Sequence, residues 1–329
     1  MKKLSILDLV RVKEGGTPGQ ALDESRDLAQ HAEKWDYERL WIAEHHNFPG
    51  IASAAVSVVI GHLAAGTEKI RIGAGGIMLP NHSPMVIAEQ FGTLAHLFPG
   101  RIDLGLGRAP GTDPATVRAL RRTPNAAESF PQDVLELQGY FSENAANQPV
   151  QAVPAAGTEV PLWILGSSQF GASMAAEFGL PYSFASHFAP QQLHAALEIY
   201  RTRFKPSKQS ARPYLMVGVN IIAAETDDEA TFLATTQQMS FADLFRKSRS
   251  LMRPPIEDID SYWTPFEKAQ AGQMLARSII GSPETVRFGL KNLFEETGAD
   301  ELIIVSDVFD HAKRLRSFEL IAEAFEEIA

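Results

Sequence analysis

The stretch from Ile70 to Leu106 decides the fold, and it reads IRIGAGGIMLPNHSPMVIAEQFGTLAHLFPGRIDLGL. Its first part, Ile70 to Leu79, and its last part, Arg101 to Leu106, are short apolar runs typical of β-strands. Between them lies a longer helical pattern with Pro84 in its first turn, a position that proline favours. A strand, a helix and a second strand in this order indicate parallel pairing through a right-handed crossover.

The same alternation runs along the whole chain. Eight strand-like runs are each followed by a helical region, and the runs are 4–10, 39–43, 70–79, 101–106, 162–165, 182–185, 215–223 and 302–305. Eight such units favour an α/β fold of the closed (β/α)₈ TIM-barrel type, with an open doubly wound sheet as the alternative. We expect one barrel domain over residues 1–329.

Two segments exceed a minimal barrel, and both follow a predicted strand. The segment from Ala109 to Gly157, after strand four, is rich in proline and predicts an extended loop with one helix. The segment from Thr235 to Arg277, after strand seven, carries a basic cluster made of Arg246, Lys247, Arg249 and Arg253. That cluster is either a solvated helix face or part of a lid, because insertions after strands lie at the mouth where barrel chemistry occurs.

Composition excludes several classes of protein. The 329 residues carry 30 Lys and Arg against 40 Asp and Glu, a net charge of −10, which argues against nucleic acid or anionic lipid as partners. The absence of cysteine excludes disulfides, thiolate metal sites and cysteine nucleophiles, and it fits a reducing compartment. The most apolar helical region, Ile51 to Ala65, is shorter than the roughly 20 residues of a membrane span. We therefore expect a soluble, cytoplasmic protein with no membrane partner.

The end of strand two reads Glu44-His45-His46. Adjacent residues of an extended chain point to opposite faces, so the two histidines do not both enter a barrel mouth. One of them is a candidate general acid or base, and the alternative is a pair of half-exposed polar residues. The helical His-Glu-x-x-His pattern is absent, and no metal site is predicted.

Three further strand ends carry candidate binding residues. Strand three holds Gly73, Gly75 and Gly76, which indicate either a flat ligand close to the backbone or packing within the barrel. Strand four ends at Arg108, a candidate anion clamp whose alternative is a surface arginine. Strand five ends in Gly166-Ser167-Ser168 before a helix, where free N–H groups and hydroxyls suit a phosphate as well as an ordinary cap. Together these residues suit a flat phosphorylated cofactor.

These motifs resemble the bacterial luciferase-like flavin monooxygenases. The resemblance rests on Glu44-His45-His46, on residues 73–80, on residues 101–108, on Gly166-Ser167-Ser168 and on Gly281-Ser282-Pro283-Glu284, and it extends from Leu4 to the last helix. The chain is most similar to the single-subunit oxidoreductases of that superfamily. It departs from the luciferase subunits in having Gly166 where they have an acidic residue, and in lacking their cysteines.

The resemblance implies a function and a role for each candidate residue. His45 falls on the active-site histidine, a cis peptide bond that supports the flavin ring falls between Gly75 and Gly76, and the phosphate-binding residues fall on Arg108 and Ser167, with Ser168 beside them. The implied activity is oxidation of a small organic substrate by dioxygen and reduced FMN, which a separate NAD(P)H:flavin reductase supplies. The long segment after strand seven matches a mobile loop that shields the flavin, and a homodimer is implied. The alternatives are a dehydrogenase dependent on the deazaflavin F420, and a flavin-binding protein without turnover.

Overall fold

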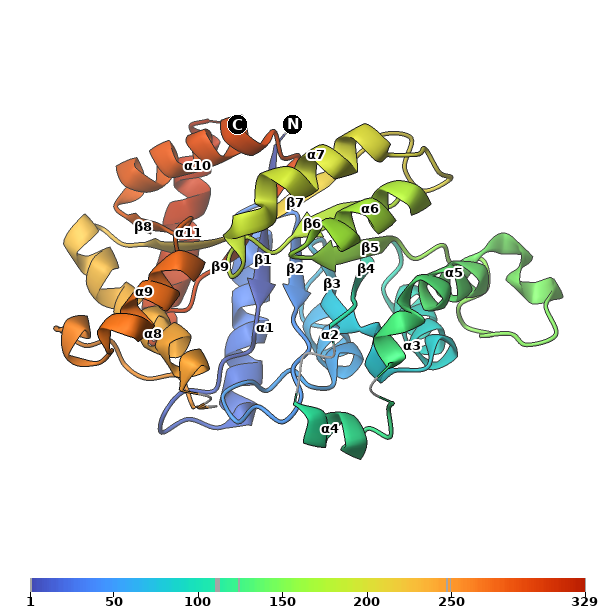
Figure 1. The fold of residues 1–329 in the computed structure, drawn as a ribbon, viewed down its shortest axis with the longest axis horizontal. Helices are drawn as coiled ribbons and strands as arrows, with labels where there is room; N and C mark the ends of the chain where they lie inside the picture. Colours follow the sequence, from blue (N-terminus) through green and yellow to red (C-terminus); the bar gives the residue numbers. More distant parts are fainter. Residues whose placement is uncertain (1, 110–112, 124, 247, 249, 329) are drawn as a thin grey trace.

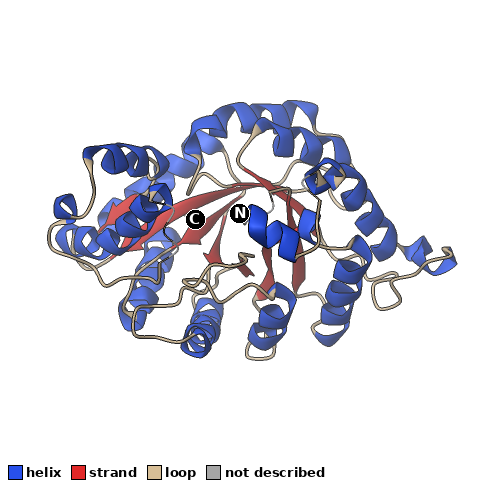
Figure 2. Cartoon of the chain, turned by 60° about the horizontal axis from the view of Figure 1, so that its bottom comes forward, coloured by secondary structure: helices blue, strands red, loops and turns tan. Residues whose placement is uncertain are grey.

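Eight parallel strands close into a barrel. The computed structural model describes residues 2–109, 113–123, 125–246, 248 and 250–328. The barrel strands are β1 (Lys3–Asp8), β2 (Arg39–Ile42), β3 (Arg71–Met78), β4 (Ile102–Gly107), β5 (Leu162–Gly166), β6 (Tyr182–Phe184), β7 (Leu215–Ala223) and β9 (Glu301–Val305). Each strand from β1 to β7 pairs with the next, and β9 pairs with both β7 and β1, which closes the ring. Figure 2 shows these strands curving inside a layer of helices, and the predicted TIM barrel is confirmed.

Eight helices follow the eight barrel strands and cover the outside of the barrel (Figure 1). They are α1 (Pro18–Lys34), α2 (Val56–Ala64), α3 (Pro84–Leu97), α5 (Phe130–Phe141), α6 (Gln169–Phe178), α7 (Leu193–Arg203), α10 (Pro283–Thr297) and α11 (His311–Glu326). Local sequence sets their ends. Thr17 and Gln20 form a capping box at the start of α1, and Gly298 ends α10 in the left-handed conformation that glycine tolerates.

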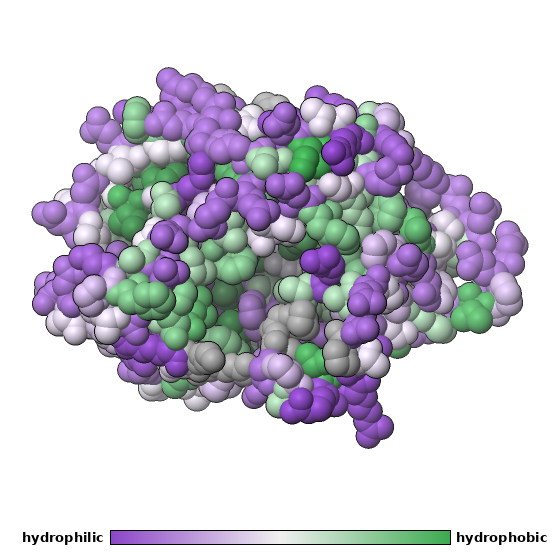
Figure 3. Space-filling view, in the orientation of Figure 1, coloured by the Kyte–Doolittle hydropathy of each residue, from purple (hydrophilic) through white to green (hydrophobic). Residues whose placement is uncertain are grey.

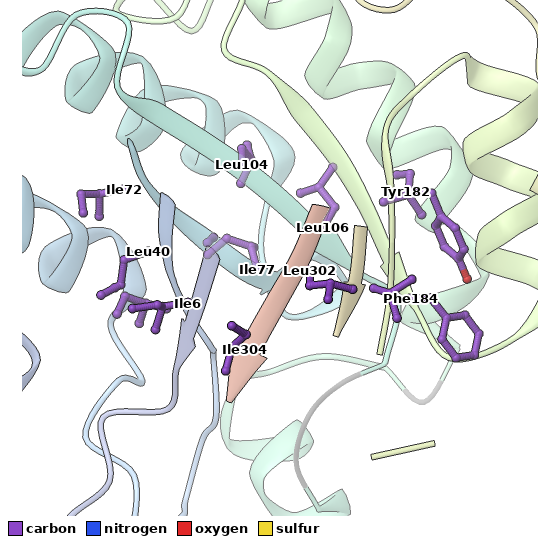
Figure 4. Packing of buried hydrophobic residues seen from close by; sticks show 14 of the residues in the cluster. Ile6, Leu40, Ile72, Ile77, Leu104, Leu106, Tyr182, Phe184, Leu302 and Ile304 are labelled. Atoms are coloured by element: carbon purple, nitrogen blue, oxygen red, sulfur yellow. The ribbon is translucent and has the colours of Figure 1, made fainter. Parts of the chain in front are cut away.

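Alternation along the strands divides the core into two layers. Ile6, Leu40 and Ile304 point outward and pack with other apolar residues in the layer between strands and helices (Figure 4). Their neighbours in the chain, Leu7, Trp41 and Ile303, point inward and fill the barrel together with Trp163 and Met216. Because residues within the strands fill both layers, the residues just beyond the strand ends are the ones available to form a site.

A ninth strand was not predicted. β8 (Ile279–Gly281) pairs in parallel with the last residues of β7, where Ile221 lies opposite Ile279, and it lies outside the closed ring. No strand was expected between the seventh run, 215–223, and the eighth, 302–305. Three residues are too few to display a two-residue period, which explains why the pattern did not reveal the strand.

Both predicted insertions are present. The first contains α4 (Pro114–Ala119), the 3₁₀ turns η2 (Ala126–Glu128) and η3 (Glu143–Asn147), and α5, so it holds more helix than expected. The second contains α8 (Asp227–Phe245), η5 (Ile259–Ser261), α9 (Pro265–Met274) and β8, and it begins before Thr235 because Thr226 caps α8. Two shorter 3₁₀ turns, η1 (Leu79–Asn81) and η4 (Pro190–Gln192), follow β3 and β6. Within the described ranges, every helix is too short or too polar to span a bilayer.

Candidate active site

One cavity at the carboxyl ends of the strands brings all six predicted site residues together. Its volume is about 490 Å³, and its lining includes His45, Gly75, Gly76, Arg108, Ser167 and Ser168. Figure 3 shows the molecule hollowed near the centre of this face, with apolar residues gathered beside the hollow. The carboxyl ends of parallel strands are where barrel proteins place their chemistry, so the predicted residues occupy the expected end.

Gly75 and Gly76 of β3 allow close packing behind the cavity wall. The peptide bond between Gly75 and Gly76 is cis, as the resemblance implied, and the pairing of β3 with β4 shifts register between Ala74 and Ile77. A Cβ on Gly75 would lie 2.7 Å from Leu7 Cδ1, and one on Gly76 would lie 2.6 Å from the Gly105 carbonyl oxygen. Both distances are too short for a side chain. The glycines are therefore required by the packing of the barrel, whatever the cavity binds.

Three side chains and a helix end give one wall of the cavity the groups that favour an anion. Ser168 is the N-cap residue of α6, yet its side chain makes no capping hydrogen bond, so the hydroxyl is available to a ligand. Ser167 and Arg108 line the same cavity, and the exposed guanidinium of Arg108 lies 4.1 Å from the centre of the Phe170 ring. Backbone N–H groups at the start of a helix favour an anion, and guanidinium adds a full positive charge.

His45 faces the cavity as a neutral imidazole. Its Nδ1 atom is buried and has no hydrogen-bond partner among the described residues. Burial lowers the pKa of His45 to about 4, with a further contribution from the charge of Arg11. A buried ring nitrogen without a partner is uncommon in proteins, and it points to a ligand that supplies the missing hydrogen bond.

His46 is not among the residues that line the cavity, in agreement with the prediction that the two histidines do not both enter the mouth. Its Nε2 atom lies 2.6 Å from Glu44 Oε1, and His82 Nε2 lies 2.8 Å from the same oxygen. The Met78 amide donates to the other oxygen of Glu44. Burial alone raises the pKa of Glu44, but the hydrogen bonds from His46 and His82 outweigh it and lower this pKa to about 2.

The same three side chains have the donor types of a metal site. One ligand atom from each of Glu44, His46 and His82 lies within 4.8 Å of the others. The sequence did not reveal this group, because His82 directly follows η1 and lies far along the chain from Glu44 and His46. Hydrogen bonds already account for the arrangement, and the absence of a metal stays a prediction.

The insertion after β7 forms a further wall. Gln237, Ser240 and Leu244 of α8 line the cavity, which places this insertion at the mouth as expected. In the predicted basic cluster, Arg246 is paired with Glu267 at 2.8 Å and Arg253 with Asp243 at 2.7 Å. Lys247 and Arg249 lie outside the described residues. The mobility of this segment stays a prediction.

Three polar cavity residues that lie just past strand ends were not predicted. They are Arg11 after β1, His187 after β6 and Asp307 after β9. The Nδ1 atom of His187 is buried without a partner in the described part of the chain, and burial lowers its pKa to about 4. All three lie two or three residues past a strand end, so the rule that found His45 and Arg108 would have found them too.

Comparison with known sequences places the chain among monooxygenases. A sequence model described as luciferase-like monooxygenase matches residues 2–301. The chain is 53% identical to the uncharacterised protein YvbT of Bacillus subtilis (strain 168), covering 98% of this chain and 96% of the relative. It is 50% identical to a luciferase-like monooxygenase of Escherichia coli (strain K12), covering 98% and 97%. An N-acetyl-S-alkylcysteine monooxygenase of Bacillus subtilis is 29% identical, covering 98% of each chain.

Solved structures of the same fold include proteins that use either of two cofactors. The apo structure of MsnO8 has a TM-score of 0.88 and 34% identity, covering 99% of each chain. An FMN complex of the oxygenating constituent of 3,6-diketocamphane monooxygenase from Pseudomonas putida has a TM-score of 0.72 and 18% identity, covering 98% of each. An F420-dependent secondary alcohol dehydrogenase has a TM-score of 0.72 and 15% identity, also covering 98% of each. The two more distant likenesses show the fold alone.

Proposed function

The chain belongs to the luciferase-like monooxygenase family, and we propose that it is a two-component enzyme that oxidises a small organic substrate with reduced FMN and dioxygen. One observation carries the proposal: a single cavity has an anion-binding wall at Arg108 and Ser167 and also a neutral, unpartnered imidazole at His45. A flat phosphorylated cofactor uses both features at once. Reduced FMN, when bound, supplies the electrons that activate dioxygen.

The anion-binding wall would hold the phosphate of FMN. Arg108 offers a bidentate guanidinium, Ser167 and Ser168 offer hydroxyls, and the start of α6 offers backbone N–H groups. The backbone at Gly75 and Gly76 would support the flavin ring, because both residues line the cavity. This assignment explains why an arginine and two serines, whose side chains make no hydrogen bond to the residues that the structure describes, face one space.

His45 would act on the substrate side of the cofactor. As a neutral imidazole at pH 7 it can donate or accept a proton at Nδ1, the atom that has no partner in the protein. The residues of α8 would keep water out of the cavity, since water diverts oxygen chemistry into side reactions.

The proposal includes two partners. Reduced FMN would come from a separate NAD(P)H:flavin reductase. The protein would act as a cytoplasmic homodimer through helices of the first half, where Val58 on α2 and Val86 and Leu97 on α3 are exposed apolar side chains. The alternative cofactor is F420, because F420-dependent proteins share the fold.

Titration with three ligands tests the cofactor. Quenching of flavin fluorescence should show tight binding of FMN, weaker binding of riboflavin, which lacks the phosphate, and no binding of F420. Absence of FMN binding at micromolar concentration would overturn the proposal. Tight F420 binding with oxygen-independent turnover would establish the alternative, and FMN binding without any oxygen-dependent change would indicate a flavin-binding protein without turnover.

Two histidine variants test the proposed catalytic role of His45. Photoreduced FMN is mixed with the protein in aerated buffer, and oxygen uptake and substrate oxidation are followed with a panel of thioethers and ketones. His45→Ala should keep FMN affinity but lose coupled product, whereas His96→Ala on α3, outside the cavity, should change neither. Equal product yield from the His45 variant and the wild type would rule out this role.

A further inference from the structure

Arg11 is an arginine whose donors are largely unused. Its side chain is 9% exposed, and Nη2 donates one hydrogen bond of 2.9 Å to Ser240 Oγ. The buried Nε atom has no hydrogen-bond partner in the described ranges, and the nearest carboxylate oxygen, Asp307 Oδ2, is 3.9 Å away. Removing a guanidinium from water without replacing its hydrogen bonds is unfavourable, so this geometry calls for a ligand.

Two other arginines of the same protein, one part-buried and one buried, show what a purely structural arginine does. Arg101 donates from Nε and both terminal nitrogens to backbone and hydroxyl oxygens of residues 64, 67 and 70. Arg39 likewise donates from Nε, Nη1 and Nη2 to two carboxylates. Arg11 differs from both because it faces the cavity, and its hydrogen bond to Ser240 is the one that its five N–H groups make to described side chains.

Asp307 presents unused acceptors beside these unused donors. Its carboxylate lines the same cavity, its side chain is 8% exposed, and it makes no hydrogen bond to any described residue. The neighbouring acid Asp8 is already neutralised by Arg314 at 2.9 Å and hydrogen-bonded to Ser25. Arg11 and Asp307 therefore face one cavity as loosely associated opposite charges, and Arg314 is also close enough to Asp307 for their charges to interact.

We propose that Arg11 and Asp307 together bind the head group of the substrate, with a carboxylate on Arg11 and an N–H group on Asp307. The head group is thus that of an amino acid or an N-acylated amino acid. The proposal rests on the proposed function, because it assigns the substrate class of the same cavity. A carboxylate without an adjacent N–H would be repelled by Asp307, and an amine without a carboxylate would be repelled by Arg11.

The position of this pair suits a substrate that reacts at its other end. Arg11 is close enough to His45 for its charge to affect that imidazole, so a head group held here lies near the predicted catalytic residue. The remaining surface nearby is apolar and includes Phe48 and Ile51, which suit an apolar side chain. The arrangement is complementary to a small molecule with a polar head and an apolar tail.

Calorimetric titration of the oxidised FMN-loaded protein with three matched probes tests the proposal. The probes are N-acetyl-S-benzylcysteine, its primary amide, which lacks the carboxylate, and 3-(benzylsulfanyl)propanoate, which lacks the acylamino group. The wild type should bind the first probe about tenfold or more tightly than either analogue, since each analogue leaves a buried charged group unpaired. Arg11→Gln should abolish the preference over the amide, and Asp307→Asn the preference over the propanoate.

Three controls separate this role from others. Ser240→Ala removes the tether of Arg11 to α8 but should retain both preferences. Arg11→Lys keeps the charge and should retain a reduced preference for the carboxylate. FMN affinity, measured independently, should be unchanged in all variants, which also shows that they fold.

Several outcomes would overturn the inference. They are equal or undetectable binding of the three probes by the wild type, loss of preference in Ser240→Ala, and a fall in FMN affinity in Arg11→Gln that matches its loss of probe affinity. Failure of the proposed function is recognised separately, because it appears as absent FMN binding or absent oxygen uptake. The probe titration can then be repeated on the flavin-free protein.

Discussion

The two ends of the barrel differ in whether their buried polar side chains have hydrogen-bond partners. At the amino ends of the strands, a floor cluster of Arg39, Arg71, Asp103 and Glu301 is fully hydrogen-bonded. At the carboxyl ends, the mouth contains Arg11, His45 and His187, each with a buried nitrogen that has no partner in the described ranges. A satisfied network stabilises a fold, whereas unsatisfied groups destabilise it unless a ligand completes them. The contrast therefore separates the end that holds the barrel together from the end that binds.

The floor cluster should give the largest loss of stability when it is broken. In the wild type, Arg39 donates to Asp103 at 2.6 Å and to Glu301 at 2.8 Å. Arg39→Met leaves both carboxylates buried without their main counter-charge. We expect the free energy of unfolding in urea to fall by about 3–5 kcal/mol. Lys205→Met, which breaks an exposed ion pair with Glu177, is the control and should change it by less than about 0.5 kcal/mol. A loss below about 1 kcal/mol for Arg39→Met would contradict the contrast.

The two buried histidines of the mouth should make the free energy of unfolding fall at acidic pH. The pKa values of His45 and His187 are lowered to about 4 by burial, so the unfolded chain takes up protons between pH 6.5 and 4 that the folded chain does not. Stability is therefore present above pH 6.5 and lost as the pH falls through this window, by an order of 3 kcal/mol per imidazole at its lower end. The hydrogen bond to Glu44 raises the pKa of His46, which acts in the opposite direction.

Urea titrations at pH 7, 5.5 and 4.5 measure this dependence. His187→Gln removes one of the two buried imidazoles and should make the decline between pH 6.5 and 4.5 visibly shallower than in the wild type. His96→Gln, which removes an exposed histidine of α3 that has no ion pair among the described residues, is the control for the loss of a histidine. If the His187 variant and the wild type lose stability in parallel, the imidazole is not held neutral by the fold.

The sequence predicts part of the difference between the two ends of the barrel, because strand-end motifs are visible in it and pairings across the barrel are not. Strand-end positions such as His45 and Arg108 were predicted because glycine-rich and polar motifs interrupt apolar runs there. Arg39 and Glu301 were not recognised, because a charged first residue of a strand has the same pattern whether it faces solvent or the barrel interior. Arg11 and Asp307 lie just past strand ends, where the same rule applies, but their proximity to each other is visible only when the closed ring brings β1 and β9 side by side. The hydrophobic period identifies elements, whereas pairings across the ring need the three-dimensional structure.

The phosphate end of the mouth should show a selective effect on ligand affinity. Arg108→Ala removes a guanidinium that would contact the phosphate of FMN, so FMN affinity should fall roughly tenfold or more. Riboflavin affinity should stay nearly constant, because riboflavin has no phosphate. Fluorescence quenching measures both, and the ratio of the two dissociation constants is the decisive number. An equal fall for FMN and riboflavin would mean that Arg108 acts on the cavity as a whole.

The smallest expected effect is on the stability of the ligand-free protein when that same residue is removed. Arg108 is exposed, and its guanidinium lies over the ring of Phe170, a residue that is itself 40% exposed. Such a contact is worth about 0.5–1 kcal/mol, so Arg108→Ala should lower the free energy of unfolding by no more than that. Ser167→Ala should change it by less than about 0.5 kcal/mol. At a hundredfold excess of FMN over its dissociation constant the wild type gains about 2.7 kcal/mol, and at the same FMN concentration the Arg108 variant should gain distinctly less. A large loss without ligand would place Arg108 with the floor cluster, whereas a loss seen chiefly with ligand shows that the mouth contributes to stability through what it binds.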